Sequence, residues 1–234
     1  MTDVVYVLNG KSKYGNEEIR YSIRSMWQYG RNLGRLCIVG QRPSFLNVWK
    51  HIPSTDLIDP VWCKDINIAH DILLACADPE ISDPFIFLSD DNFMIRTFDA
   101  DAFPAYYMDA YKPDMSSTYE RAVHNTFMIL WGLGYARLIN RFFDIHLPIP
   151  IHKKCMIDAF ARFDWRNQPF TVKTIYANQC DRLVPVKTTD CKIRNPKSFP
   201  TCPIGFSTND EITPELWTAI KSRYPSPSKW EKKS

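Results

Sequence analysis

Three short runs of consecutive apolar residues constrain the fold of this chain most strongly. They occupy residues 4–8, 36–40 and 85–88, and the first is rich in β-branched side chains. A strand with one face in water alternates apolar and polar residues, whereas a strand buried on both faces is apolar throughout. Burial on both faces is typical of a parallel sheet covered by helices. The chain is therefore predicted to be α/β, with a mixed, mostly parallel sheet flanked by helices.

Helical patterns separate these runs. Apolar residues recur with helical spacing after Asn16, which we expect to cap the first helix. Residues 48–52 predict a short third strand, and a second helix is expected from Ile66, with Asp65 as its cap and Pro79 as its stop. The β-α-β-β order begins an α/β sheet, and we expect the core to be Rossmann-like.

The second half of the chain has weaker patterns. Residues 117–120 have the form of a capping box and predict a helix that ends at Gly132. Two prolines favour an extended segment at 144–150, a short helix is expected at 154–163, and Thr213 is expected to cap the last helix. We expect one domain with two halves, at 1–100 and 101–192, and a C-terminal extension at 193–234.

Composition narrows the class of protein. The seven cysteines have no zinc-binding spacing, and an odd number cannot pair fully within one chain. With no apparent leader and no long apolar stretch, this predicts a cytoplasmic protein without a membrane span. The net charge of +3 is too mild for a dedicated nucleic-acid binder. Phosphate-loop and dinucleotide fingerprints are missing from the sequence. Oligomeric state cannot be inferred.

Asp90 and Asp91 follow directly after the apolar strand at 85–88. Ligands of open α/β sheets bind beyond the carboxyl ends of the strands, so this pair is delivered to the expected ligand edge. Two adjacent carboxylates repel each other, which favours a divalent cation such as Mg²⁺ or Mn²⁺ bridging a diphosphate. The alternative is a turn capped by these aspartates without any metal.

Other polar residues are candidates for the same site. On an extended segment Asp144 and His146 share one face, and Asp144 is then available as a general base toward an acceptor hydroxyl. Arg20 and Arg24 share a helical face and either bind phosphate or pair with neighbouring glutamates. The remaining candidates for donor contacts are Asn9, Gly10, Lys64, Asp65, Asn67, Lys187, Asp190 and Lys192.

Several of these segments resemble two related groups of proteins. Residues 16–25, 36–39 and 85–91 occur in the same order as in GT-A glycosyltransferases with a DXD-type motif and in the Stealth family of sugar-phosphate transferases. The Stealth likeness is closest in the Glu-x-Arg-Tyr-Ser-x-Arg-Ser pattern of residues 18–25 and in the Asp-Asp pair. Residues 3–192 also look similar to short phage and bacterial proteins described as glycosyltransferases.

The resemblance implies a GT-A core with a nucleotide-binding half at 1–100 and an acceptor and metal half at 101–192. In this core Asp91 holds Mn²⁺ or Mg²⁺ on the diphosphate of a nucleotide sugar. Asp90 would be a second ligand or bind ribose, and His146 would complete the metal shell. Ser89 replaces the first acid of the usual motif, which leaves the division of roles between the aspartates open. The expected activity is transfer of a sugar to a hydroxyl of a glycan, a small molecule or, in a phage, a modified DNA base. The alternatives are transfer of a sugar 1-phosphate and a non-catalytic module that binds a nucleotide or glycan.

Overall fold

A five-stranded sheet forms the centre of the protein. The computed structural model describes residues 1–8, 12–109, 111–135, 141–208 and 211–232. The sheet has the order β10-β5-β1-β3-β4, and its strands are Ile149–Ile151, Phe85–Leu88, Thr2–Leu8, Leu33–Gly40 and Lys50–Ile52. β1 pairs in parallel with β3 and β5, β3 pairs in parallel with β4, and β10 is antiparallel to β5. The prediction of an α/β fold with a mixed, mostly parallel sheet is confirmed.

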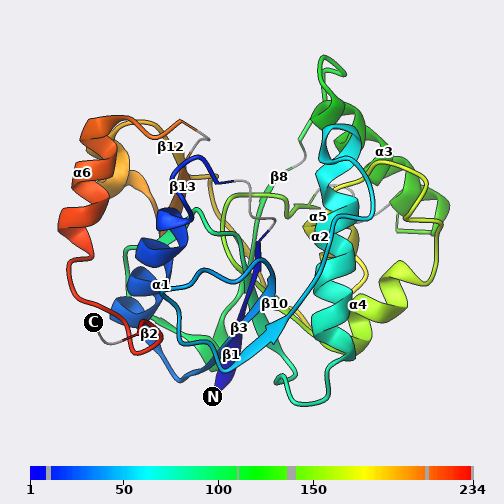
Figure 1. Ribbon diagram of the computed structural model, residues 1–234. Helices are drawn as coiled ribbons and strands as arrows, with labels where there is room; N and C mark the ends of the chain where they lie inside the picture. Colours follow the sequence, from blue (N-terminus) through cyan, green and yellow to red (C-terminus); the bar gives the residue numbers. More distant parts are fainter. Residues whose placement is uncertain (9–11, 110, 136–140, 209–210, 233–234) are drawn as a thin grey trace.

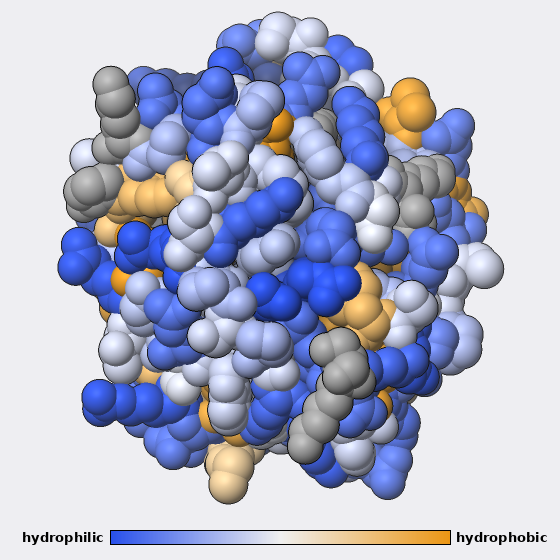
Figure 2. All heavy atoms as spheres, turned by 60° about the vertical axis from the view of Figure 1, so that its left-hand side comes forward, coloured by the Kyte–Doolittle hydropathy of each residue, from blue (hydrophilic) through white to orange (hydrophobic). Residues whose placement is uncertain are grey.

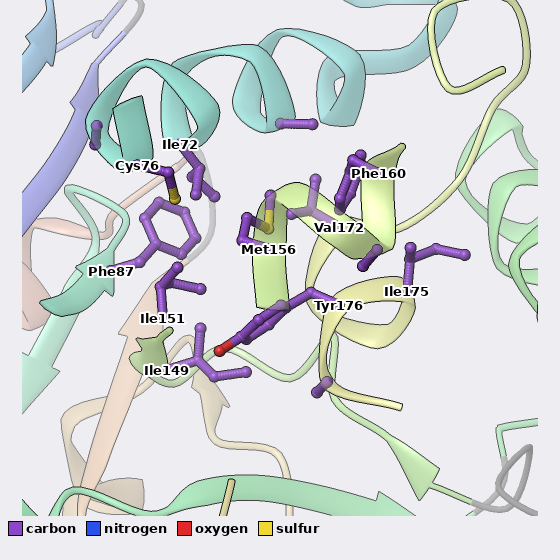
Figure 3. Packing of buried hydrophobic residues seen from close by; sticks show 14 of the residues in the cluster. Ile72, Cys76, Phe87, Ile149, Ile151, Met156, Phe160, Val172, Ile175 and Tyr176 are labelled. Carbon is purple, nitrogen blue, oxygen red and sulfur yellow. The ribbon is translucent and has the colours of Figure 1, made fainter. Parts of the chain in front are cut away.

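Helices lie on both sides of this sheet (Figure 1). They are α1 Glu17–Tyr29, α2 Pro60–Ala77, α3 Thr118–Gly132, α4 Lys153–Phe160, α5 Val172–Ala177 and α6 Pro214–Arg223, and α6 lies outside α1. Alternate strand residues point to opposite faces, so Val4, Tyr6 and Ile86 pack with α1, while Val5 and Phe87 pack with α2, α4 and α5. Figure 3 shows the second cluster, in which Phe87 faces Ile72, Cys76 and Met156. Burial on both faces explains why the strands are apolar throughout.

Three smaller sheets surround the core. The first contains β11 Pro185–Lys187, β8 Ala105–Asp109 and β9 Arg141–Phe142. The second contains β12 Lys192–Ile193, β13 Gly205–Thr208 and β6 Asn92–Met94, and the third pairs β2 Gly30–Arg31 with β7 Phe98–Asp99. The short helices η1 Ala100–Ala102 and η3 Pro196–Thr201 complete the described elements. Because β13 pairs with β6, the C-terminal region lies beside the Asp-Asp turn.

Two predicted helix caps are wrong. Asn16 has a left-handed backbone conformation and makes no capping hydrogen bond. α2 begins at Pro60 rather than at Ile66, because Asp59 accepts a hydrogen bond from the Val61 N–H and proline suits the first helical position. Asp65 therefore lies inside α2, after a non-helical Cys63, and binds a different segment.

The other predicted helices are confirmed with small changes in their ends. The Ser117 side chain accepts a hydrogen bond from the Glu120 N–H, and Thr213 accepts one from the Leu216 N–H. The helix expected at 154–163 ends earlier, at Phe160. Within the described ranges, none of the helices is long and apolar enough to cross a membrane. Hydrophilic residues dominate the face shown in Figure 2, where apolar residues are scattered.

Candidate functional site

A pocket of about 430 Å³ lies at the carboxyl ends of β1 and β5. It is lined by Val7, Leu8, Ser12, Lys13, Glu18, Asp56, Pro60, Lys64, Asn67, Ile68, Asp71, Ser89, Asp90, Asp91, Thr208 and Ile212. Four residues predicted from the sequence meet here, namely Lys64, Asn67, Asp90 and Asp91. We call this space the inner pocket.

The two aspartates are positioned by the turn between β5 and β6. The Ser89 N–H donates to Asn92 Oδ1 at 3.1 Å, and Ser25 of α1 accepts a hydrogen bond from the Met94 N–H at 2.9 Å. Ser207 of β13 donates to Asp91 Oδ2 at 2.7 Å. The turn that follows β5 is therefore held by α1 and by β13.

Asp90 carries an electrostatic cost. Its pKa is raised to about 7, first by burial and then by the negative charges of Asp91 and Glu18, against hydrogen bonds from the backbone of residues 90 and 91. Glu18 is buried in the first turn of α1 and accepts hydrogen bonds from the Ser12 hydroxyl. Sequence reasoning missed Glu18 as a site residue. Glu18 lies in the first turn of the helix that follows β1. This position could have indicated a site residue, because the start of that helix lies at the edge of the sheet where ligands bind.

Asp144 and His146 lie in a bent segment and not in an extended strand, so the expected extended geometry is wrong. The Leu147 N–H donates to the Ile145 carbonyl at 2.9 Å, which forms a tight turn around His146. The Lys173 ammonium donates to the carbonyl of Ile145 and braces this turn. Asp144 instead accepts a hydrogen bond from the Tyr119 hydroxyl at 3.0 Å.

Asp190 holds His146 through two contacts. Its Oδ1 accepts from the His146 N–H at 2.9 Å, and its Oδ2 lies 2.7 Å from His146 Nδ1. Burial raises the pKa of Asp190, but these contacts with His146 outweigh it and lower the pKa. The His146 carbonyl accepts from Asn92 at 3.5 Å, so this pair lies near the Asp-Asp turn although neither residue lines the inner pocket. Within the described ranges, no three His, Cys, Asp or Glu side chains form a group that could hold a metal, and the metal shell stays a prediction.

Arg20 and Arg24 bind carboxylates away from the inner pocket. Arg20 pairs with Glu17, and both arginines pair with Glu231 near the C-terminus, at 3.2 and 2.8 Å. One of the two alternatives read from the sequence was pairing with a glutamate of the same helix, and Arg20 pairs with Glu17 in this way. Glu231 could not be foreseen, because it is more than 200 positions away along the chain. These arginines anchor the C-terminal segment to α1.

The remaining candidates have varied surroundings. The Asn67 side chain accepts from the N–H groups of Leu57 and Ile58 and donates to the Ile58 carbonyl, so it fixes the loop before α2. Lys187 pairs with Asp109, and Lys192 is exposed on β12. Asn9 and Gly10 lie outside the described residues.

A second space of about 530 Å³ adjoins the inner pocket and shares Leu8, Asp56 and Asp71 with it. We call it the outer pocket. Its other lining residues are Gly40, Gln41, Arg42, His51, Pro53, Ser54 and Thr55. His51 Nε2 lies 2.8 Å from the Gly40 carbonyl, which ties β4 to the end of β3. The two pockets follow the carboxyl edge of the parallel strands.

Asp65 gives a stability prediction. Its pKa is raised from 3.8 to about 7, first by burial and then by the charge of Asp144, while its Oδ1 accepts from the Val172 N–H at 2.9 Å. Between these two pH values the folded chain binds more protons than the unfolded chain, so stability falls as pH rises from about 4 to about 7 and stays low above.

We expect Asp65→Asn, which keeps the acceptor for Val172, to raise the free energy of unfolding at pH 8 by about 2 kcal/mol, with a smaller gain at pH 5. Urea unfolding at both pH values measures this difference. An equal effect at pH 5 and pH 8 would contradict the assigned cause.

The geometry thus brings the acids of residues 90 and 91 into a divided pocket at the edge of a parallel sheet. No protein-family model matches the chain, and no curated protein matches it.

Proposed function

We propose that this chain is a metal-dependent glycosyltransferase that moves a sugar from a nucleotide-sugar donor to a hydroxyl acceptor. One observation carries the proposal: Asp90 and Asp91 lie together in the inner pocket, at the carboxyl end of β5. Open α/β sheets bind nucleotides at this edge. A Rossmann-like core of the GT-A type is part of the same proposal.

The charge of the inner pocket supports a cation. Of the residues that the structure describes, five carboxylates line it, those of Glu18, Asp56, Asp71, Asp90 and Asp91, together with the ammonium groups of Lys13 and Lys64. A diphosphate is repelled by such an excess of acid unless a divalent ion lies between them. Oxygen ligands suit Mg²⁺ and Mn²⁺, so Asp90 and Asp91 fit a metal of this class. When bound, this ion would stabilise charge on the departing diphosphate.

The proposed reaction is a substitution at the anomeric carbon. The acceptor oxygen forms a bond to that carbon, the bond to the diphosphate oxygen breaks, and the hydroxyl proton passes to a carboxylate. Asp144 is the proposed proton acceptor, and the Tyr119 hydroxyl orients it through the contact at 3.0 Å. A glycan, a small molecule and a hydroxymethylated DNA base all offer such a hydroxyl.

The first test is the melting temperature of the purified protein with a panel of nucleotide sugars, with and without Mn²⁺. We expect one donor to raise the melting temperature by about 5 °C when Mn²⁺ is present, because a ligand that binds only the folded chain stabilises it. The same donor without metal should have little effect. If every donor leaves the melting temperature unchanged with Mn²⁺, the proposal is wrong.

The mass of the product identifies the group transferred. A glycosyltransferase adds the sugar alone and releases a nucleoside diphosphate. A sugar-phosphate transferase adds the sugar with one phosphate and releases a nucleoside monophosphate. The proposal requires that the acceptor gains the sugar alone. An acceptor that gains the sugar with one phosphate would show that the chain is a sugar-phosphate transferase instead.

A further inference from the structure

Asp71 is a buried carboxylate at the junction of the inner and outer pockets. It lies on α2, is 8% exposed, and lines both pockets. The Ser54 hydroxyl donates a hydrogen bond to its Oδ1. Lys or Arg side chains of the described residues form no ion pair with Asp71. The carboxylate is thus held by a hydroxyl and lies at the cleft.

This arrangement is unfavourable for the empty protein. Burial raises the pKa of Asp71; the hydrogen bond from Ser54 and the nearby charge of His70 oppose the rise, and the charge of Asp56 adds to it. A buried carboxylate without a cationic partner is stabilised mainly by hydrogen-bond donors. A ligand with hydroxyl groups at the junction would supply such donors.

A nucleoside diphosphate is connected in the order base, ribose, diphosphate, and this order indicates which hydroxyl groups would lie at the junction of the two pockets. Asp90 and Asp91 place the diphosphate in the inner pocket, on the proposed function. The base is then directed to the outer pocket, along the edge between β1 and β4. Ribose connects the two parts, so its hydroxyls fall at the junction, where Asp71 lies.

We propose that Asp71 binds the ribose hydroxyls of the donor and makes the site selective for ribonucleotides over deoxyribonucleotides. The inference rests on the proposed function and names the sugar of the nucleotide, which the Asp-Asp pair does not determine. Carboxylates of other α/β nucleotide sites accept hydrogen bonds from ribose in the same way. Ser54 is a positioning residue, because it holds Oδ1 of Asp71.

The test is the affinity of the protein for nucleoside diphosphates. The dissociation constants of ADP, CDP, GDP and UDP are measured by calorimetry with Mn²⁺, together with those of their 2′-deoxy and 3′-deoxy forms. For the base that binds, we expect one deoxy form to bind at least about 10-fold more weakly, since a hydrogen bond to a charged group is lost. Asp71→Asn should reduce this ratio to about 1 while the affinity for that deoxy form stays nearly unchanged.

Asp158→Asn is the matched control, because it removes the same charge from an exposed residue of α4 that pairs with Lys154. It should keep the ribose preference. If Asp71→Asn does not fold, Ser54→Ala replaces it, and the preference must fall by a few-fold.

The outcomes separate the two proposals. Equal binding of ribo and deoxy forms to the wild-type chain overturns the role of Asp71 and leaves the proposed function intact. The role of Asp71 is also overturned if the preference for the ribo form survives Asp71→Asn or Ser54→Ala. It is overturned as well if these variants change only the preference among the four bases. If none of the four diphosphates binds with Mn²⁺, the proposed function itself fails.

Discussion

Asp91→Asn is expected to lower the rate of sugar transfer at least about 100-fold, because the chain then lacks a carboxylate for the ion that stabilises the departing diphosphate. The substitution is mild for the fold. Asparagine keeps an oxygen for the Ser207 hydroxyl, which donates to Asp91 at 2.7 Å. The rate is measured with the donor identified by the melting-temperature panel, at saturating Mn²⁺.

Two further measurements make this result specific. Asp158→Asn, which removes an equal charge outside both pockets, should leave the rate unchanged. The melting temperature of Asp91→Asn without ligand should match or exceed that of the wild type, since one of two repelling carboxylates is gone. A variant with full transfer activity would remove Asp91 from the reaction and with it the main support for the metal.

Gly40→Ala should give the largest loss of stability, about 4 kcal/mol in the free energy of unfolding, from backbone strain and steric overlap. Gly40 ends β3 with a φ of +96°, a region that alanine rarely adopts. A Cβ atom there would lie 2.0 Å from the Leu8 carbonyl oxygen of β1, inside the central sheet. For a chain of this size the melting temperature should fall by about 10 °C.

Gly132→Ala is the control for this experiment. Gly132 ends α3, and a Cβ atom there meets nothing within 4 Å. Alanine favours a helix more than glycine does, so this variant should be slightly more stable than the wild type, by about 0.5 kcal/mol. If Gly40→Ala melts within 2 °C (about 1 kcal/mol) of the wild type, the close approach of β3 to β1 is wrong.

The local order of elements could be predicted because it depends on neighbours along the chain. Continuous apolar runs predicted β1, β3 and β5, and the caps Ser117 and Thr213 located α3 and α6. The position of Asp90 and Asp91 at the edge of the sheet follows from the same reasoning. Errors arose where two local signals competed, as at α2, where Asp59 and Pro60 begin the helix ahead of the predicted cap Asp65.

The partners of the polar residues could not be predicted. Arg24 binds Glu231, His146 binds Asp190, and Asp65 binds the backbone of Val172. Each pair joins segments that are far apart in the sequence, and residue types alone do not say which of many donors and acceptors will meet. The extended geometry expected at Asp144 and His146 was wrong because the chain makes a tight turn at residues 145–147.

The sequence by itself therefore determined the α/β class and the delivery of two aspartates to the ligand edge, because burial and helix capping act over a few residues. Only the tertiary structure decided what surrounds them. Glu18 and Asp71 reach the cleft from a helix after β1 and a helix after β4, and Ser207 of β13 holds Asp91 through a hydrogen bond. Charges in a pocket act through space, so the pKa of Asp90 is raised only once these segments are packed together. The same packing places Asp71 where the inner and outer pockets meet.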